Sequence, residues 1–245
     1  MRVLVTRPYD DALQTAAKLK ALGHDAVLAP LLEIRFLDGE EIALDGVQAI
    51  LATSANGVRA LARRSARRNV ALFAVGRQSA DAARAAGFRD VRSADGDGAA
   101  LAQAVAQWAR RDGGTLLHVA GRETKGALSA TLAKEGFDVR SATLYEALAA
   151  EALPAAAADA LRGQSLDAAL FFSPRSARIF RDLVRRAGLA QCCRTVTAAA
   201  ISEAAAKALD GLDFASVRAA GRPDQEALLT LLDPAASCWR PRPRL

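Results

Sequence analysis

The sequence predicts an α/β protein made of two similar three-layer α/β/α lobes with parallel sheets. The chain repeats itself, and within each half short apolar runs alternate with helical patterns. A connector without a helical pattern lies between residues 28 and 47, which indicates that extended linkers join the lobes. A repeat of this length is typical of a duplicated domain rather than a solenoid.

The repeat is clearest between residues 3–34 and residues 116–147, which match without a gap. Both segments read as an apolar strand, a turn, an amphipathic helix, a glycine stop and a second strand. The matched pairs are Leu19 with Leu132, Gly23 with Gly136, Asp25 with Asp138 and Glu33 with Glu146. The two glycines stand where a helix C-cap glycine belongs.

The remainder of each half matches more loosely. The matched positions are residues 50–61 with 170–180, which places Thr53 over Ser173 and Asn56 over Ser176, and residues 72–88 with 197–212, which places Gly76 near Ser202. Short strands around Val91 and Val217 follow, and helical patterns at about 98–110 and 223–232 come after them. Each half therefore supplies five strands that alternate with helices.

No full-length helix is predicted between the strand that ends near Leu28 and the strand that starts near Val47. Parallel neighbours in one sheet need a crossover, most often a helix. Residues 30–36 read as extended instead, so strand 47–52 can belong to a different sheet from the strand before it. We expect two extended linkers, near residues 30–36 and 143–149, and hinge motion about them.

Polar turns follow the strands of both halves where helices begin. Ser173 occupies an N-cap position and Pro174 the first helical position. Ligands of doubly wound sheets collect at the carboxyl ends of the strands, where helix N-termini attract anions. The candidate binding residues are Arg7, Thr53, Ser54, Asn56, Gly76, Arg77, Ser79, Gly121, Arg122, Ser173, Pro174, Arg175, Ser176 and Ser202. One such turn can simply cap its own helix, whereas the set on two lobes favours a large polyanion.

Composition limits the partners. The 245 residues carry a net charge of +6, which favours an acidic ligand. No stretch is long and apolar enough to span a membrane, and no secretory signal opens the chain, so we expect a cytoplasmic protein. Cys192, Cys193 and Cys238, with two histidines, give no metal-ligand spacing and no disulfide framework. We therefore expect neither a metal nor a cofactor.

Motifs for nucleotides and for hydrolysis are missing from the sequence, which has no Rossmann fingerprint, phosphate loop or nucleophile elbow in the right context. His24 lies in a predicted surface turn and His118 inside a predicted strand, so a serine–histidine triad is not expected. The basic cluster at residues 63–68 is interpreted as the solvated end of a helix, because no aromatic stacking platform accompanies it. Nucleic acid is therefore not an expected partner.

Tyr145 is the candidate catalytic residue. It lies at the end of a predicted strand, and its partner in the repeat is Leu32, so the duplication itself does not require a tyrosine there. Two interpretations remain open: a buried tyrosine with one satisfied hydroxyl, or a weak acid that assists a leaving group.

With these features the chain resembles the uroporphyrinogen-III synthase family. The likeness is carried by the opening VLVTRP, the turns TSANGV and FSPRSA, the segment AVGRQSADAA and the strand of Tyr145, and it covers nearly the whole chain in order. The family turn that usually reads Ile-Gly, followed shortly by Thr-Ala, is Ile201-Ser202-Glu203-Ala204-Ala205 here.

The resemblance implies two α/β lobes with exchanged segments, residues 1–35 with 151–245 and residues 36–150. It also implies a cofactor-free lyase, expected to be a monomer, that cyclises the linear tetrapyrrole hydroxymethylbilane with inversion of the last ring and loss of water. The family tyrosine matches Tyr145. The alternative is a non-catalytic two-lobed protein that binds an anionic small molecule.

Overall fold

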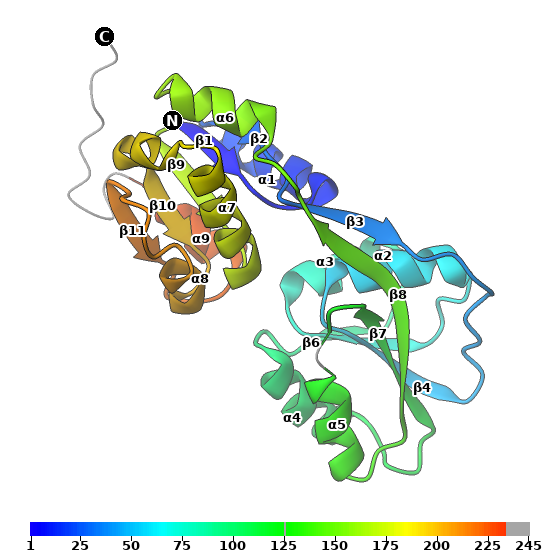
Figure 1. Ribbon diagram of the computed structural model, residues 1–245. Coiled ribbons are helices and arrows are strands. Elements are labelled where there is room, and N and C mark those ends of the chain that lie inside the picture. Colours follow the sequence, from blue (N-terminus) through cyan, green and yellow to red (C-terminus); the bar gives the residue numbers. More distant parts are fainter. Residues whose placement is uncertain (125, 234–245) are drawn as a thin grey trace. The chain divides into compact units, whose positions relative to one another are not determined.

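The computed structural model describes residues 1–124 and 126–233. The chain divides into two compact units, each an α/β structure with its own sheet (Figure 1). Unit 1 consists of Met1–Glu33 and the chain from Leu148 onward, and unit 2 consists of Ile34–Ala147. The Arg-Pro segment at residues 239–245, to which the sequence assigns no role, lies outside the described residues.

Unit 1 is built on a five-stranded sheet of order β11-β10-β9-β1-β2 in which every pair is parallel. Its elements are β1 (Arg2–Val5), α1 (Tyr9–Ala21), β2 (Asp25–Leu28), α6 (Ala155–Arg162), β9 (Ala168–Phe171), α7 (Pro174–Arg186), the 3₁₀ helix η1 (Ala190–Thr195), β10 (Thr197–Ala200), α8 (Glu203–Lys207), β11 (Ser216–Ala219) and α9 (Gln225–Thr230).

Helices cover both faces of this sheet, because alternate residues of each strand point to opposite sides. On one face Leu4 and Phe171 pack with apolar residues of α6 and α7. On the other face Val3 and Leu170 pack with residues of α1 and α9. Unit 1 is therefore the three-layer arrangement that the sequence predicts.

Unit 2 is built on a six-stranded sheet of order β3-β8-β7-β4-β5-β6. Its elements are β3 (Leu32–Phe36), β4 (Val47–Ala52), α2 (Ala55–Arg64), β5 (Ala71–Ala74), α3 (Arg77–Ala85), β6 (Val91–Ser93), α4 (Gly98–Trp108), β7 (Thr115–Gly121), α5 (Ala127–Lys134) and β8 (Val139–Ala149). One core cluster joins the sheet to α2 and α3, and the other joins it to α4 and α5, so this unit is also three-layered.

Parallel pairs dominate both sheets, as the sequence predicts, but one pair in unit 2 is antiparallel. The amide of Leu37 donates to the carbonyl of Leu144, and the amide of Ala150 donates to the carbonyl of Leu31. As the residue number rises on one strand it falls on the other, so β3 runs antiparallel to its neighbour β8. Because β8, β7 and β4 are parallel to one another, β3 also runs opposite to β4. The connection from β3 to β4 can therefore stay at one end of the sheet, and no helical crossover is needed between them.

The two extended linkers are confirmed as strands. The chain passes from unit 1 to unit 2 within β3, after Glu33, and returns within β8, after Ala147. In the first half the corresponding stretch is divided into β2 and β3, with Pro30 between them, whereas β8 continues without a break. Proline lacks a backbone donor, so Pro30 interrupts the strand in the first half. Its repeat partner in β8 is Thr143, which has this donor, and β8 is not interrupted there.

The duplication is visible at the ends of α1 and α5. Gly23 and Gly136 have φ angles of 76° and 88°, in the left-handed region that glycine adopts without strain. The amide of the residue after each glycine bonds back to a carbonyl five residues earlier, from His24 to Leu19 and from Phe137 to Leu132. Both glycines are thus helix stops of the same kind, as the sequence predicts.

Candidate functional site

The candidate residues gather at the carboxyl edge of each sheet. Because the strands that precede the turns are parallel, their carboxyl ends share one edge in each unit. In unit 1 this edge carries Arg7, Ser202 and the turn 173–176, and in unit 2 it carries the other candidate turns.

Ser173 caps α7, and Pro174 is the first residue of that helix, so both predictions are confirmed. The Ser173 Oγ accepts a hydrogen bond of 3.1 Å from the amide of Ser176. The Ser176 hydroxyl is buried and donates to the Ser173 carbonyl at 3.0 Å, so it holds the turn together.

Ser202 caps α8 in the same way and accepts from the amide of Ala205 at 3.3 Å. Ser202 therefore keeps the N-terminus of the helix in place although the family glycine is absent. The sequence repeat aligns Gly76 of unit 2 near Ser202. Gly76 is the N-cap of α3, and it has no side chain that could accept a hydrogen bond in this way.

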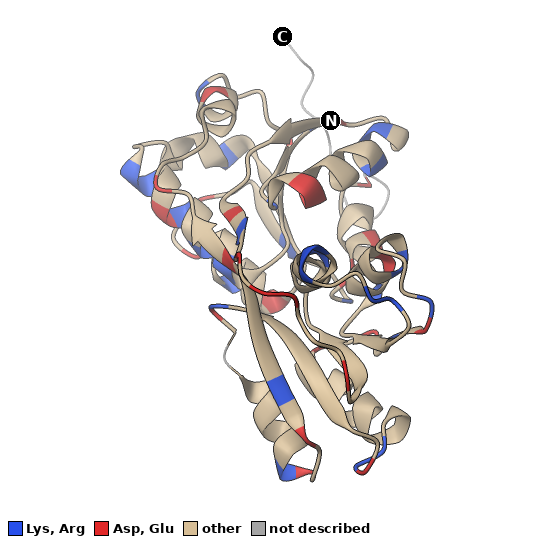
Figure 2. Cartoon of the chain, turned by 90° about the vertical axis from the view of Figure 1, so that its right-hand side faces the viewer, with Lys and Arg blue, Asp and Glu red and all other residues tan. Residues whose placement is uncertain are grey.

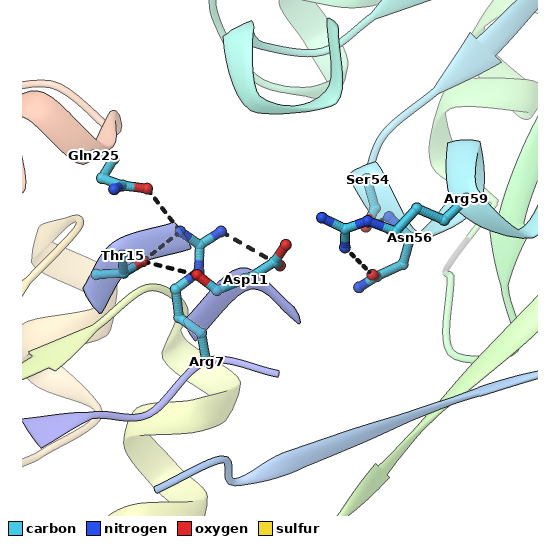
Figure 3. A network of polar contacts seen from close by, with 7 residues as sticks. All are labelled: Arg7, Asp11, Thr15, Ser54, Asn56, Arg59 and Gln225. Atoms are coloured by element: carbon cyan, nitrogen blue, oxygen red, sulfur yellow. Dashed lines mark hydrogen bonds and ion pairs between the residues drawn. The ribbon is translucent and has the colours of Figure 1, made fainter. Parts of the chain in front are cut away.

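Arg7 is buried, with only 6% of its surface exposed. Its guanidinium lies 3.4 Å from the Asp11 carboxylate and donates to Gln225 at 2.8 Å and to Thr15 at 3.3 Å (Figure 3). It also stacks 4.2 Å from the centre of the Phe172 ring. These contacts join the turn after β1 to α1 and α9 within unit 1. The Arg7 charge is thus compensated locally, and its role as a substrate ligand stays a prediction.

Ser54, not Thr53, is the N-cap of α2, and its Oγ accepts from the amide of Asn56 at 3.1 Å. The sequence alignment of Thr53 with Ser173 is therefore wrong by one residue, because capping geometry equates Ser54 with Ser173. The Asn56 side chain is buried, and its Oδ1 accepts from Arg59 at 2.8 Å (Figure 3).

The turn after β5 is open. A β-carbon added to Gly76 would meet no atom within 4 Å, and the φ of −161° suits any residue. The glycine thus leaves bare backbone at the start of α3. Arg77 is largely exposed, and its guanidinium lies 3.8 Å from Asp95, while Ser79 is buried one turn further on.

Tyr145 lies against Gly121 in the neighbouring strand. A β-carbon at Gly121 would be 2.8 Å from two atoms of the tyrosine ring and 3.1 Å from its hydroxyl oxygen. The register of β7 and β8 shifts here, and the amide of Arg122 donates to the Tyr145 carbonyl at 2.9 Å. Tyr145 is inside β8, which runs on to Ala149, so its placement at a strand end is corrected.

Arg122 takes part in an ion-pair group of three residues. The Glu146 carboxylate lies 3.3 Å from Arg122 and 3.6 Å from Arg35. Both arginines are more than half exposed, whereas Glu146 is largely shielded. The group links β3, β8 and the turn after β7, and Arg35 was not among the residues that the sequence indicated.

The sequence also missed a role for His118. This side chain is buried in β7 and lies 3.4 Å from the Thr53 hydroxyl and 3.0 Å from Ser129. Burial lowers the pKa of His118 below its ordinary value, so the ring is neutral at pH 7. The partners come from sequence positions 11 and 65 residues away, which no local motif marks.

Charged residues occur in both units, with Lys and Arg interspersed among Asp and Glu along the chain (Figure 2). In the basic cluster at 63–68, Arg64 and Arg68 donate to backbone carbonyls and Arg67 pairs with Asp45. These arginines therefore close loops of unit 2. Among the described residues no group of three or more His, Cys, Asp and Glu side chains is placed to hold a metal ion, and no helix is long and apolar enough to cross a membrane.

Comparison with known proteins decides the family. The model of the family "Uroporphyrinogen-III synthase HemD" matches residues 14–230. The chain belongs to the uroporphyrinogen-III synthase family. Members of this family are cyclising lyases of tetrapyrrole biosynthesis, and the chain is an enzyme of this class in haem biosynthesis.

Solved structures of the uroporphyrinogen-III synthase family share the fold. The uroporphyrinogen-III synthetase of Helicobacter pylori is 17% identical, with a TM-score of 0.62 over 95% of this chain and 98% of that chain. A mutant uroporphyrinogen III synthase of the extremely thermophilic bacterium Thermus thermophilus is 20% identical, with a TM-score of 0.50 over 96% of this chain and 98% of that chain. No curated protein sequence matches the chain.

Proposed function

We propose that this member of the uroporphyrinogen-III synthase family acts on hydroxymethylbilane and holds its carboxylates at the helix N-termini of both sheet edges. The observation that carries the proposal is the recurrence of one turn geometry, a strand followed at once by a capped helix, at Ser54, Ser173 and Ser202. Each such N-terminus offers backbone donors and the positive end of a helix dipole.

Several donors acting together suit a substrate with many carboxylates. A hydrogen bond to a charged group contributes about 1.5 to 3 kcal/mol, so three or four of them hold a flexible polyanion in one conformation. Holding the two ends of the substrate together also accelerates the reaction, because it lowers the entropic part of the activation barrier for ring closure. We include in this proposal all the candidate binding residues that the sequence indicates. The lobes that carry them are proposed to be residues 1–35 with 151–245 and residues 36–150.

Tyr145 is the proposed catalytic residue. The terminal C–O bond of hydroxymethylbilane breaks, and the departing hydroxide takes a proton from the tyrosine hydroxyl or from water. The last ring then inverts through a spiro intermediate, and ring closure releases a proton from a pyrrole carbon, so that water is lost overall. The support for this role is the position of the ring beside Gly121, at the same edge of the unit 2 sheet as the turn of Ser54.

An isomer assay with freshly generated hydroxymethylbilane tests the proposal. The expected product is the inverted isomer, formed faster than the uninverted isomer of the spontaneous reaction. Binding of the tetrapyrrole without a change in the product isomer would instead identify a non-catalytic binder. Size-exclusion chromatography of the same sample tests the expected monomer, and cell fractionation tests the expected cytoplasmic location.

A further inference from the structure

His118 is a buried side chain that the proposed reaction does not use. Its Nε2 lies 3.4 Å from the Thr53 Oγ1, and its Nδ1 lies 3.0 Å from the Ser129 Oγ. The Ser129 Oγ in turn lies 3.0 Å from the Ser141 Oγ. The four residues form one chain of polar contacts that begins at the turn after β4, crosses β7 and α5, and ends on β8.

We propose that His118 is a positioning residue that fixes the Thr53 hydroxyl as a hydrogen-bond donor to a carboxylate of the substrate. The inference rests on the proposed function, in which the turn after β4 binds such a carboxylate. It adds His118 and Ser129, which no local motif indicates, to the residues that determine binding.

The two tautomers of a neutral imidazole give Thr53 opposite properties. If the proton is on Nε2, the ring donates to the Thr53 oxygen, and the Thr53 hydrogen is left to point at an anion. If the proton is on Nδ1, Nε2 accepts the Thr53 hydrogen, and the threonine presents only lone pairs, which repel a carboxylate. Binding an anion therefore requires the first tautomer.

In the proposed arrangement the Ser129 hydroxyl donates to Nδ1, which selects the first tautomer, and the Ser129 oxygen accepts from Ser141, a direction that the contact between the two hydroxyls allows. Every donor in the chain then points toward Thr53, and hydrogen bonds aligned in this way polarise one another. The low pKa that burial gives His118 keeps the ring neutral, so Nδ1 remains an acceptor. The nearby helix α4 carries no charged residue, and α5 carries only Lys134, at its end.

The test compares His118→Gln with His118→Leu. The glutamine amide nitrogen reaches the place of Nε2 and still donates to Thr53, whereas leucine does not. We expect His118→Leu to raise KM for hydroxymethylbilane about tenfold, the effect of one lost charge-assisted hydrogen bond, and His118→Gln to stay near the wild type. Ser129→Ala removes the hydrogen bond that favours the first tautomer of His118. We expect it to raise KM about threefold, because a neutral hydrogen bond contributes less than a charge-assisted one. Ser216→Ala is the matched control. It removes a 3.3 Å hydrogen bond to Thr197 at the amino-terminal ends of β10 and β11 in unit 1, away from the candidate turns.

A double-mutant cycle separates this inference from the proposed function. In a Thr53→Val enzyme, His118→Leu should change KM no further, because the hydroxyl that it orients is gone. An equal rise of KM in both backgrounds overturns the positioning role. An unchanged KM in Thr53→Val alone refutes the substrate role of this turn instead. Should His118→Leu fail to fold, an unchanged KM in Ser129→Ala overturns the inference.

Discussion

Gly121 and Tyr145 are packed so closely that no side chain fits between them: a β-carbon at residue 121 would lie 2.8 Å from the tyrosine ring. The contact joins neighbouring strands where their register shifts. The glycine is therefore required by space and not by an unusual backbone angle. Any larger residue at 121 must displace the ring of Tyr145.

Gly121→Ala should lower kcat at least tenfold while the protein stays folded, because the general acid contribution that it disturbs is typically 10²- to 10⁴-fold. Steady-state kinetics and a thermal melt check this. Gly98→Ala is the matched control, because a β-carbon at Gly98 meets no atom within 4 Å. Full activity in Gly121→Ala would show that the ring position is unimportant for the reaction.

Tyr145→Phe should retain the fold and lose most of its activity, but not all. Water can partly replace the hydroxyl as a proton donor, because the leaving hydroxyl departs readily with electron donation from a pyrrole nitrogen. The uncatalysed closure then competes, so the fraction of the uninverted isomer rises. Rate and isomer ratio are measured together on a variant with an unchanged melting temperature. A full rate would reduce Tyr145 to a packing residue.

Ser173→Asp should preserve stability but weaken substrate binding. Aspartate caps a helix about as well as serine, so the hydrogen bond to the Ser176 amide is kept. Its negative charge opposes a carboxylate at the same N-terminus, so KM should rise and the rise should shrink in high salt. Ser173→Ala should show the reverse pattern, a loss of about 1 kcal/mol in stability with a smaller change in KM. Asp97→Ser, the opposite exchange at the cap of α4, is the control for the capping effect itself.

The unfolding free energy should fall as the pH drops below about 6.5, the ordinary pKa of histidine. The pKa of His118 is lowered in the folded state by burial, so below that pH the unfolded chain binds a proton that the folded protein does not. The pKa of His24 is lowered too, first by burial and then by the charged amino terminus. Denaturant unfolding between pH 5 and pH 8 measures the slope. His118→Gln should reduce the slope to the part that His24 contributes, and an unchanged slope would show that His118 is protonated equally in both states.

Local patterns predict much of the fold. The helix stops at Gly23 and Gly136 and the cap at Ser173 are set by residues next to one another in the sequence, so their identity is enough to place them. The linkers also follow from local signals, since Pro30 and the missing helix mark one of them. The antiparallel pairing of β3 with β8 does not follow, because it depends on which strand a distant segment meets.

The site is predicted less completely for the same reason. Thr53 and Ser54 are both plausible caps by residue type, and only the backbone shows that Ser54 is the one used. The enclosure of Arg7 by Asp11 and Gln225 combines residues from the two ends of the chain. The network of His118 likewise arises from packing across three elements, which periodicity cannot show.

The place of β1 inside its sheet has a consequence for synthesis on the ribosome. Val3 pairs with Ala26 on one side and with Ala168 on the other, so β1 needs a partner that is translated much later. At about 5 to 20 residues per second, the wait is on the order of ten seconds. Unit 2 is one continuous stretch and emerges completely within that time, whereas the opening β1–α1–β2 segment stays half-paired. The nascent chain therefore exposes the unpaired edge of an apolar strand until β9 appears, and an exposed edge of this kind is prone to aggregation.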